Sequence, residues 1–339
     1  MTMQNNVSRT RRSLLKAAAL TAAAPAFMMR AAQASAYPAG TVSLMVPYPA
    51  GGPSDTAARI LAGPIGDALG THVVVENVGG ATGTIAAARV LNAKADGAIF
   101  FQGTQNELII PPLTNKAVRF QPDAFENLLP ISFTPLVLLV RSDLPVNTMH
   151  EFLKQAATRD ESHSYTYGSV GVGSLYHLMT EYMGKLMNIP LTHVPYTGTA
   201  PVVQALMGGQ IDFSIMPFQA SMLEMVKAGR FKALAVTSPK KPAILAHLPS
   251  ISEVPALSRF DFASYAGYFV KKGTPPDIKE KLNKAIGATL LDQNIVSRLE
   301  AEGRMMLKPM SLDQAATAYA DEVARYRELI RVTGYVQES

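Results

Sequence analysis

Four glycine-rich turns constrain most strongly what this chain can fold into. They lie at residues 47–55, 77–84, 168–174 and 195–201, and each joins a short apolar or β-branched run to the start of a helical pattern. Strands that alternate with helices are connected by right-handed crossovers, which build mainly parallel sheets. The sequence therefore predicts an α/β protein.

The first turn shows what such a junction offers a ligand. Residues 42–46 are an apolar run typical of a buried strand, and Ser54, Asp55 and Thr56 open the helical pattern that follows. The glycines between them let the backbone approach a ligand closely, and the unpaired N–H groups of a helix start favour an anion. A carboxylate or phosphate is the expected ligand. Asp55 has two interpretations: a helix N-cap, or a contact to a ligand amine, hydroxyl or bridging water.

The length of the chain favours two domains, since about 300 residues exceed a usual single core. Runs at 136–140 and 262–270 are placed to cross between domains. This predicts a discontinuous first domain, residues 37–138 and 258–339, and a second domain, residues 139–257. Ligands of open α/β sheets bind at the carboxyl ends of strands, so two turns from each domain would face one another across a cleft. The alternative is that the turns only connect strands to helices.

The N-terminal segment, residues 1–36, has the pattern of a twin-arginine export signal. Arg11 and Arg12 precede an apolar segment too short to span a bilayer, and small residues near Ala36 suggest cleavage into the periplasm. Five of the 31 basic residues and none of the 26 acidic residues fall in this segment, so the rest of the chain is balanced in charge. No basic surface for nucleic acid is expected. The absence of cysteine excludes disulfides and thiolate chemistry.

The remaining elements follow from periodicity and from start and stop signals. The segment between residues 111 and 127 is expected to be an irregular surface excursion. Helices are predicted at 85–95, 149–157, from Ser174 onwards, from Pro201 onwards, at 274–291 and at 313–332. Strands are predicted at 72–76, 98–102, 165–167, 191–194, 211–216 and 233–236 as well.

Catalytic motifs are weak. The glycine-rich turns do not match the dinucleotide fingerprint or the phosphate loop, and the six histidines show no metal-binding spacing. We therefore predict no metal and no cofactor. Two residues keep an alternative open: Ser169, and His177 about one turn after Ser174, could serve a periplasmic α/β enzyme in acyl or proton transfer. His177 could equally be a ligand contact or a core histidine.

Four motifs together resemble one family. The chain contains V-P-Y-P-A-G-G-P-S-D, V-V-V-E-N-x-G-G-A-T-G, Y-G-S-V-G-V-G-S-x-x-H and H-V-P-Y-T-G-T-A-P in this order. In sequence and spacing they are similar to the Bug family of periplasmic solute receptors for tripartite tricarboxylate transporters. The resemblance implies a two-domain Venus-flytrap of the type II periplasmic-binding-protein fold, without catalysis. It also implies a carboxylated ligand in the interdomain cleft, held partly through ordered waters.

The resemblance assigns ligand contacts to all four turns. The implied residues of the first domain are Tyr48, Ser54, Asp55, Thr56, Ala81, Thr82, Gly83 and Thr104; those of the second are Ser169, Ser174, His177, Tyr196 and Thr197. The chain departs from the family where Thr104 is followed by Gln105, Asn106 and Glu107. Another departure is Ser264-Tyr265-Ala266, where relatives usually have a tryptophan. Aliphatic di- or tricarboxylates, aromatic carboxylates such as phthalate isomers or nicotinate, and acidic amino acids all remain open as ligands.

The implied partners are a small carboxylate and the integral membrane subunits of a transporter, with a monomer as the default state of a delivery protein. A sensor that presents its closed form to a signalling partner is a further alternative. The amphipathic helix at 313–332 could form such a surface, although packing on the first domain would explain it as well.

Overall fold

The computed structural model describes residues 37–335, and the predicted export signal lies outside these residues. The described residues from Gly40 onwards belong to one compact unit. None of the helices in the described part of the chain is long and apolar enough to cross a membrane.

One mixed sheet runs through this unit in the order β2-β1-β3-β9-β4-β7-β5-β6, and β8 and β10 also pair with β4. The strands are β1 Val42–Val46, β2 Val73–Asn77, β3 Ile99–Thr104, β4 Phe125–Arg141, β5 Tyr165–Ser169, β6 Leu191–Pro195, β7 Phe213–Pro217, β8 Phe231–Val236, β9 Ala263–Lys271 and β10 Met305–Met306. The pairs β1–β2, β1–β3, β5–β6 and β5–β7 are parallel, whereas β4 and β9 run antiparallel to their neighbours. The predicted α/β class is confirmed.

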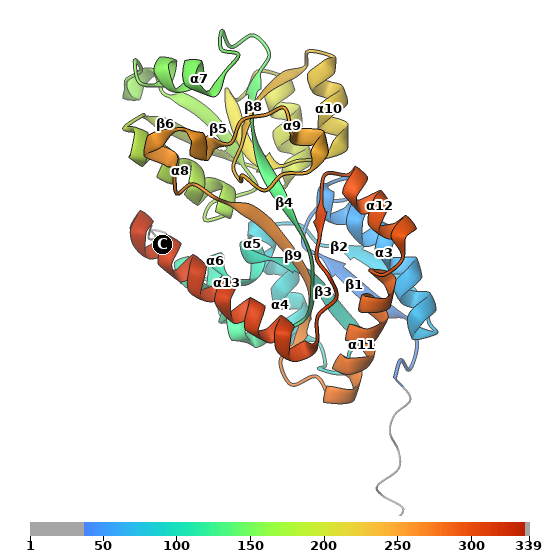
Figure 1. The fold of residues 1–339 in the computed structure, drawn as a ribbon. Coiled ribbons are helices and arrows are strands. Elements are labelled where there is room, and N and C mark those ends of the chain that lie inside the picture. Colours follow the sequence, from blue (N-terminus) through green and yellow to red (C-terminus); the bar gives the residue numbers. More distant parts are fainter. Residues whose placement is uncertain (1–36, 336–339) are drawn as a thin grey trace, which may run out of the picture. The chain divides into compact units, whose positions relative to one another are not determined.

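Strand β4 joins the two halves of the sheet (Figure 1). Its residues from Phe125 to Pro135 pair with β9, and its residues from Leu136 to Arg141 pair with β7 and β8. We call β2, β1, β3, β9, β10 and residues 125–135 the first half, and residues 136–141 with β7, β5, β6 and β8 the second half. The irregular surface excursion predicted between residues 111 and 127 is confirmed only in part: residues 115–121 form no helix or strand and none of them is buried, whereas residues 111–114 belong to a helix and β4 already begins at Phe125. Bulges beside Pro130 accommodate a residue that cannot donate to the ladder.

Helices cover both halves. They are α3 Pro53–Leu69, α4 Thr84–Asn92, α5 Gln105–Leu108, α6 Ile110–Thr114, α7 Met149–Ala156, α8 Leu175–Met187, α9 Thr199–Met207, α10 Ala220–Lys227, α11 Pro276–Thr289, α12 Gln293–Ala301 and α13 Leu312–Thr333. The sequence did not predict α5, α6, α10 or α12. Helix α6 is buried at four of its five positions, so it belongs to the interior and not to a surface excursion.

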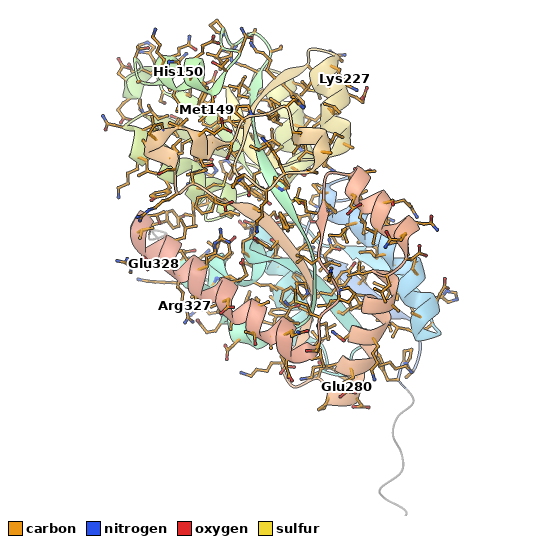
Figure 2. All side chains as sticks on the ribbon, in the orientation of Figure 1. Met149, His150, Lys227, Glu280, Arg327 and Glu328 are labelled. Carbon is orange, nitrogen blue, oxygen red and sulfur yellow. The ribbon has the colours of Figure 1, made fainter. Side chains whose placement is uncertain are left out.

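Helix α13 packs on β4 and α6 through its apolar stripe, which includes Ala315, Tyr326 and Leu329. Arg327 and Glu328 lie on its exposed side (Figure 2). Packing on the first half thus accounts for the amphipathic pattern of this helix.

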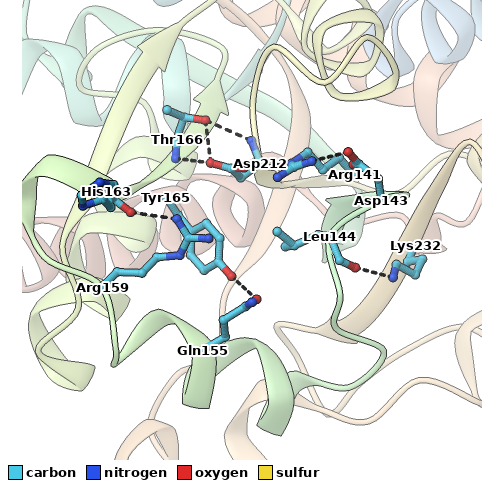
Figure 3. Close-up of polar contacts among 10 residues, drawn as sticks. All are labelled: Arg141, Asp143, Leu144, Gln155, Arg159, His163, Tyr165, Thr166, Asp212 and Lys232. Carbon is cyan, nitrogen blue, oxygen red and sulfur yellow. Dashed lines mark hydrogen bonds and ion pairs between the residues drawn. The ribbon is translucent and has the colours of Figure 1, made fainter.

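A polar network ties three strands together at the outer end of the second half (Figure 3). The Asp212 carboxylate accepts hydrogen bonds from the Thr166 backbone N at 2.8 Å and Oγ1 at 2.9 Å. It also pairs with Arg141 Nε at 2.9 Å, and Arg141 in turn pairs with Asp143. This network fixes the end of β4 against β5 and β7, away from the turns that form the candidate site.

Candidate functional site

A small cavity lies where the two halves of the sheet meet, and the non-atom space in and around it, open solvent included, is about 600 Å³. Its lining comes from the first and third turns, from β3, β4, β7 and β9, from the starts of α8 and α9, and from Arg304. The lining residues are Tyr48, Pro49, Gly52, Pro53, Ser54, Thr104, Thr134, Val170, Tyr176, Gly198, Thr199, Ala200, Pro201, Pro217, Ser264, Ala266 and Arg304. Three of the predicted site residues, Tyr48, Ser54 and Thr104, are among them.

The first turn reaches the cavity through the start of α3. Gly52 is the N-cap, and the helix start has no side-chain cap. Gly51 has φ +86°, a conformation that favours glycine. Asp55 is the third residue of the helix and not its N-cap. Its carboxylate turns back to accept hydrogen bonds from Gly51 N at 3.0 Å and Arg59 Nε at 2.9 Å, so it braces the turn.

The ionisation of Asp55 fits this bracing position. Burial alone would raise its pKa, but the hydrogen bonds from Arg59 and Gly51 outweigh burial and lower the pKa. The other carboxylate oxygen, Oδ1, is buried without a partner among the described residues. Thr56 Oγ1 donates to Gly52 O at 3.2 Å, so Thr56 also stabilises the turn.

The second turn lies beside the cavity and contacts the other half of the sheet. Ala81, Thr82 and Gly83 all have positive φ, at 46°, 55° and 85°. Thr82 Oγ1 donates to Val172 O at 3.2 Å across the two halves. A Cβ at Gly83 would overlap the Glu107 side chain. These residues do not line the cavity.

At the third turn, side chains of the protein itself accept hydrogen bonds from the backbone N–H groups at the start of α8. Ser174 is the N-cap of α8, as predicted, and accepts from His177 N. Asn106 Oδ1, from α5, accepts from Leu175 N at 2.6 Å. Ser169 and Ser174 are almost fully buried. An anion at this helix start would compete with the side chains that already accept these hydrogen bonds. The sequence analysis did not predict Asn106 as a site residue.

The two histidines near this turn are stacked inside the protein. The rings of His177 and His193 lie 4.1 Å apart between centroids. Burial, and for His177 also the neighbouring ring, lowers their pKa values to about 3 and about 4, so both are neutral near pH 7. His177 Nδ1 accepts from Gly173 N at 3.0 Å. Ser169 Oγ bonds to His193 Nε2 at 2.7 Å and not to His177, and neither histidine lines the cavity.

The fourth turn contributes the residues just after those predicted. Tyr196 is partly buried against an apolar cluster of the second half, and Thr197 is exposed. Gly198, Thr199, Ala200 and Pro201 line the cavity instead. Gly198 is the N-cap of α9, which has no side-chain cap, and Pro201 lies in the first turn of α9 as predicted.

The starts of α3 and α9 converge. A Cβ at Gly52 would lie 3.4 Å from Thr199 Oγ1, and a Cβ at Gly198 would lie 3.3 Å from the Pro49 ring. Two helix N-termini without side-chain caps therefore approach one end of the cavity, which is an arrangement suited to an anion.

Arg304 also lies at this end of the cavity. It was not among the predicted site residues. It follows Gly303, whose φ is +86°, in the connection between α12 and β10. The residue is only 7% exposed; Nη2 donates to Pro53 O in the first turn of α3, and Nη1 donates to Ser132 Oγ at 3.3 Å. Among residues 37–335 it has no carboxylate within ion-pairing distance. Burial lowers its pKa.

A buried acid lies behind the part of the wall that Tyr48 and Thr104 form. Thr104 Oγ1 donates to Glu107 Oε2 at 2.8 Å in a capping box at α5. The Tyr48 phenol lies beside the same carboxylate, and burial raises the pKa of both groups. No cluster of three or more metal-ligating side chains occurs among the residues that the structure describes.

Comparison with known proteins decides the family. The model of the tripartite tricarboxylate transporter family receptor matches residues 57–335. The chain belongs to this receptor family. It is thus a periplasmic solute-binding receptor of the Bug type, as the four motifs suggested.

Curated relatives and solved structures agree. The receptor is 30% identical over 298 residues to a protein from the ttuE-ttuC' intergenic region of Agrobacterium vitis, covering 85% of this chain and 84% of that one. It is 29% identical to BugT of Bordetella pertussis, covering 89% and 91%. The periplasmic binding protein BugD superposes with a TM-score of 0.81 at 29% identity, covering 89% of this chain and 100% of that one.

Two similar structures hold ligands. A protein of R. palustris with adipate has a TM-score of 0.80 at 29% identity, with 88% and 99% of the chains covered. MatC from Rhodopseudomonas palustris with bound malate has a TM-score of 0.79 at 26% identity, with 87% and 100% covered. The family and these neighbours are substrate-binding proteins and not enzymes, so the receptor has the two-domain α/β solute-binding fold without a catalytic role for Ser169 and His177.

Proposed function

We propose that this receptor captures a small carboxylate in the cavity between α3 and α9 and delivers it to the membrane subunits of a tripartite tricarboxylate transporter. One observation carries the proposal: two helix N-termini without side-chain caps and a buried arginine without an acidic partner converge on one end of the cavity. An anion there would be stabilised by the helix dipoles and by the guanidinium. The adipate and malate bound to two neighbours support a carboxylate.

The proposed ligand contacts divide into two groups. Tyr48, Ser54 and Thr104 would touch the ligand, together with Thr199 and Arg304, because they line the cavity. The other implied residues would act by shaping the turns. These are Asp55, Thr56, Ala81, Thr82, Gly83, Ser169, Ser174, His177, Tyr196 and Thr197.

The proposed domains are residues 37–138 with 258–339, and residues 139–257. Their closure over the ligand is supported by hydrogen bonds between the two halves of the sheet. Thr82 donates to Val172, Leu175 N donates to Asn106, and Tyr176 donates to Ser264. A ligand that contacts both domains shifts the population towards the closed state.

Export through the twin-arginine-type segment at 1–36 and a monomeric receptor complete the proposal. Both fit a protein that must meet its ligand in the periplasm and then a membrane partner. N-terminal sequencing of the protein recovered from the periplasm would test the cleavage near residue 36.

The deciding experiment for the function is a thermal-unfolding screen against aliphatic and aromatic mono-, di- and tricarboxylates and amino acids. A ligand at 100 times its dissociation constant adds about 2.7 kcal/mol to the free energy of unfolding. We expect a clear rise of the melting temperature with one carboxylate class, and recovery of that ligand unchanged after denaturation. A screen in which no carboxylate raises the melting temperature would contradict the proposal.

A further inference from the structure

Arg304 is a buried charge without an ion-paired carboxylate in the described part of the chain, although Glu302, two positions earlier, acts on it electrostatically. A guanidinium has five N–H donors, and the described contacts of Arg304 go to one carbonyl and one hydroxyl, Pro53 O and Ser132 Oγ. Its other side borders a surface groove with Glu300, but the two residues form no ion pair in the described part of the chain. Burying such a charge is costly unless an anion pairs with it.

The cavity has a single cationic end. Arg304 is the only Lys, Arg or His side chain among the described residues that line it. Through Pro53 O the guanidinium is fixed at the first turn of α3, and α3 approaches Thr199 of α9 at Gly52. The charge and both helix N-termini therefore act on the same place, which accommodates one carboxylate.

The two other helix starts predicted to attract anions are occupied by side chains of the receptor itself. Asn106 Oδ1 accepts from Leu175 N at the start of α8. Glu107 packs directly against Gly83 at the start of α4. Neither of these helix starts is therefore open to a second ligand carboxylate, because one is already filled and the residues of the other do not line the cavity.

The remaining wall is mostly apolar. It is formed by the rings of Tyr48 and Tyr176, by Val170 and Ala266, and by Pro217, with the neutral hydroxyls of Thr104, Thr134 and Ser264 between them. Such a wall favours the flat or compact body of an apolar ligand, and it would desolvate a second carboxylate without compensating it.

From these observations we infer that the ligand is a monocarboxylate with a compact apolar body, of benzoate type, and that Arg304 pairs with its carboxylate. The inference rests on the proposed function, because it names the ligand class of the same cavity. It sets this receptor apart from neighbours that hold the dicarboxylates adipate and malate.

Isothermal titration calorimetry with defined probes tests both parts. The probes are benzoate, cyclohexanecarboxylate, the neutral benzamide, adipate and malate. The variants are Arg304→Met, Arg304→Lys and Arg298→Met, the last being the same change at an exposed arginine of α12. Melting of each variant without ligand separates a role in binding from a role in folding.

We expect benzoate or cyclohexanecarboxylate to bind more tightly than benzamide, adipate and malate. Arg304→Met should raise the dissociation constant of the monocarboxylate about 10- to 100-fold, the range of a lost charge-assisted hydrogen bond. Arg304→Lys should raise the dissociation constant less than Arg304→Met does, since lysine keeps the positive charge although it lacks the planar guanidinium group. Arg298→Met should change nothing. Without ligand, Arg304→Met should melt no lower than the wild type, because it removes an unpaired buried charge.

Three results would overturn the inference. Tighter binding of adipate or malate than of both monocarboxylates would reject the ligand class while leaving the carboxylate receptor intact. An unchanged dissociation constant in Arg304→Met would reject the role of Arg304. A wild-type protein that binds none of the four carboxylates would reject the inference, and the wider screen then decides whether the proposed function fails with it.

Discussion

Asn106 caps helix α8 from the other half of the sheet: its Oδ1 accepts a 2.6 Å hydrogen bond from Leu175 N. Asn106 is fully buried in α5, whereas Leu175 begins α8, so one amide satisfies a helix start and also connects the two halves. A contact of this kind links the stability of α8 to the contact between the two halves, and so to the closure proposed above.

Asn106→Ala should therefore destabilise the protein and favour opening. Losing a buried cap leaves Leu175 N without its partner, which costs about 1–3 kcal/mol of the free energy of unfolding. Urea unfolding measures the stability, and small-angle scattering measures the radius of gyration, which should increase without ligand. Gln105→Ala is the matched control, because both described hydrogen bonds of the Gln105 side chain are to β9 in the same first half. The same radius in both variants would contradict the role of Asn106 in closure.

The stacked histidines predict a pH dependence of stability. Burial lowers the folded-state pKa of His177 to about 3 and that of His193 to about 4, below the value of about 6.5 in an unfolded chain. The unfolded chain therefore binds more protons, so their contribution is present above pH 6.5 and is lost as the pH falls towards about 4 for His193 and about 3 for His177. By pH 5 each histidine should cost about 2 kcal/mol of the free energy of unfolding.

Urea unfolding at pH 7.5 and pH 5.0 measures this loss. His177→Phe should reduce the difference between the two pH values, since it removes one of the groups. His150→Phe, at an exposed position of α7 (Figure 2), should leave the difference unchanged. An undiminished difference in His177→Phe would show that other groups cause the pH dependence.

Local signals were sufficient for much of the fold. The four turns, the Ser174 cap and the long helix α13 were predicted because glycine, capping residues and helical periodicity act over a few positions. Strand β4 was predicted only in part, since Pro130 and Pro135 are unusual inside a strand and the bulges beside Asn127 and Pro130 depend on pairing with β9.

The site was harder to predict because its polar groups come from distant segments. Asn106 and Leu175 are 69 positions apart, and Arg304 and Pro53 are 251 positions apart. Nothing within a few residues of Arg304 marks it as a lining residue, because neither its burial nor its lack of a carboxylate partner has a local pattern. The sequence predicted helix starts around a ligand site but could not tell that Asn106 already accepts a hydrogen bond from one of them.

Asp212 is expected to dominate the stability of the outer end of the second half (Figure 3). Asp212→Ala removes the pair with Arg141 and two hydrogen bonds to Thr166, with an expected cost of about 2–4 kcal/mol. Asp143→Ala is the control, because Asp143 pairs with the same arginine but its side chain is 72% exposed; it should cost less than about 1 kcal/mol. Urea unfolding of both variants measures the two losses in the free energy of unfolding. Equal losses would contradict the larger contribution of Asp212.

Gly51 and Gly83 have nearly equal φ angles, so an alanine at each position distinguishes the energetic cost of the backbone conformation from the cost of side-chain overlap. Gly51 has φ +86° and Gly83 has φ +85°, so an alanine at either position pays a similar conformational penalty of about 1 kcal/mol. A Cβ at Gly51 would meet no atom within 4 Å, whereas a Cβ at Gly83 would overlap Glu107 Cγ and Pro47 Cβ.

Gly83→Ala should therefore destabilise the protein by about 1–3 kcal/mol more than Gly51→Ala, because the overlap forces the wall behind Tyr48 to move. The same shift should weaken ligand binding in Gly83→Ala more than in Gly51→Ala, since Tyr48 and Thr104 line the cavity beside Glu107. Urea unfolding and calorimetric titration with the best carboxylate from the screen measure the two effects. Equal stability of the two variants would mean that the Glu107 side chain moves aside at little energetic cost. The packing around Glu107 would then not hold the wall of the cavity in place.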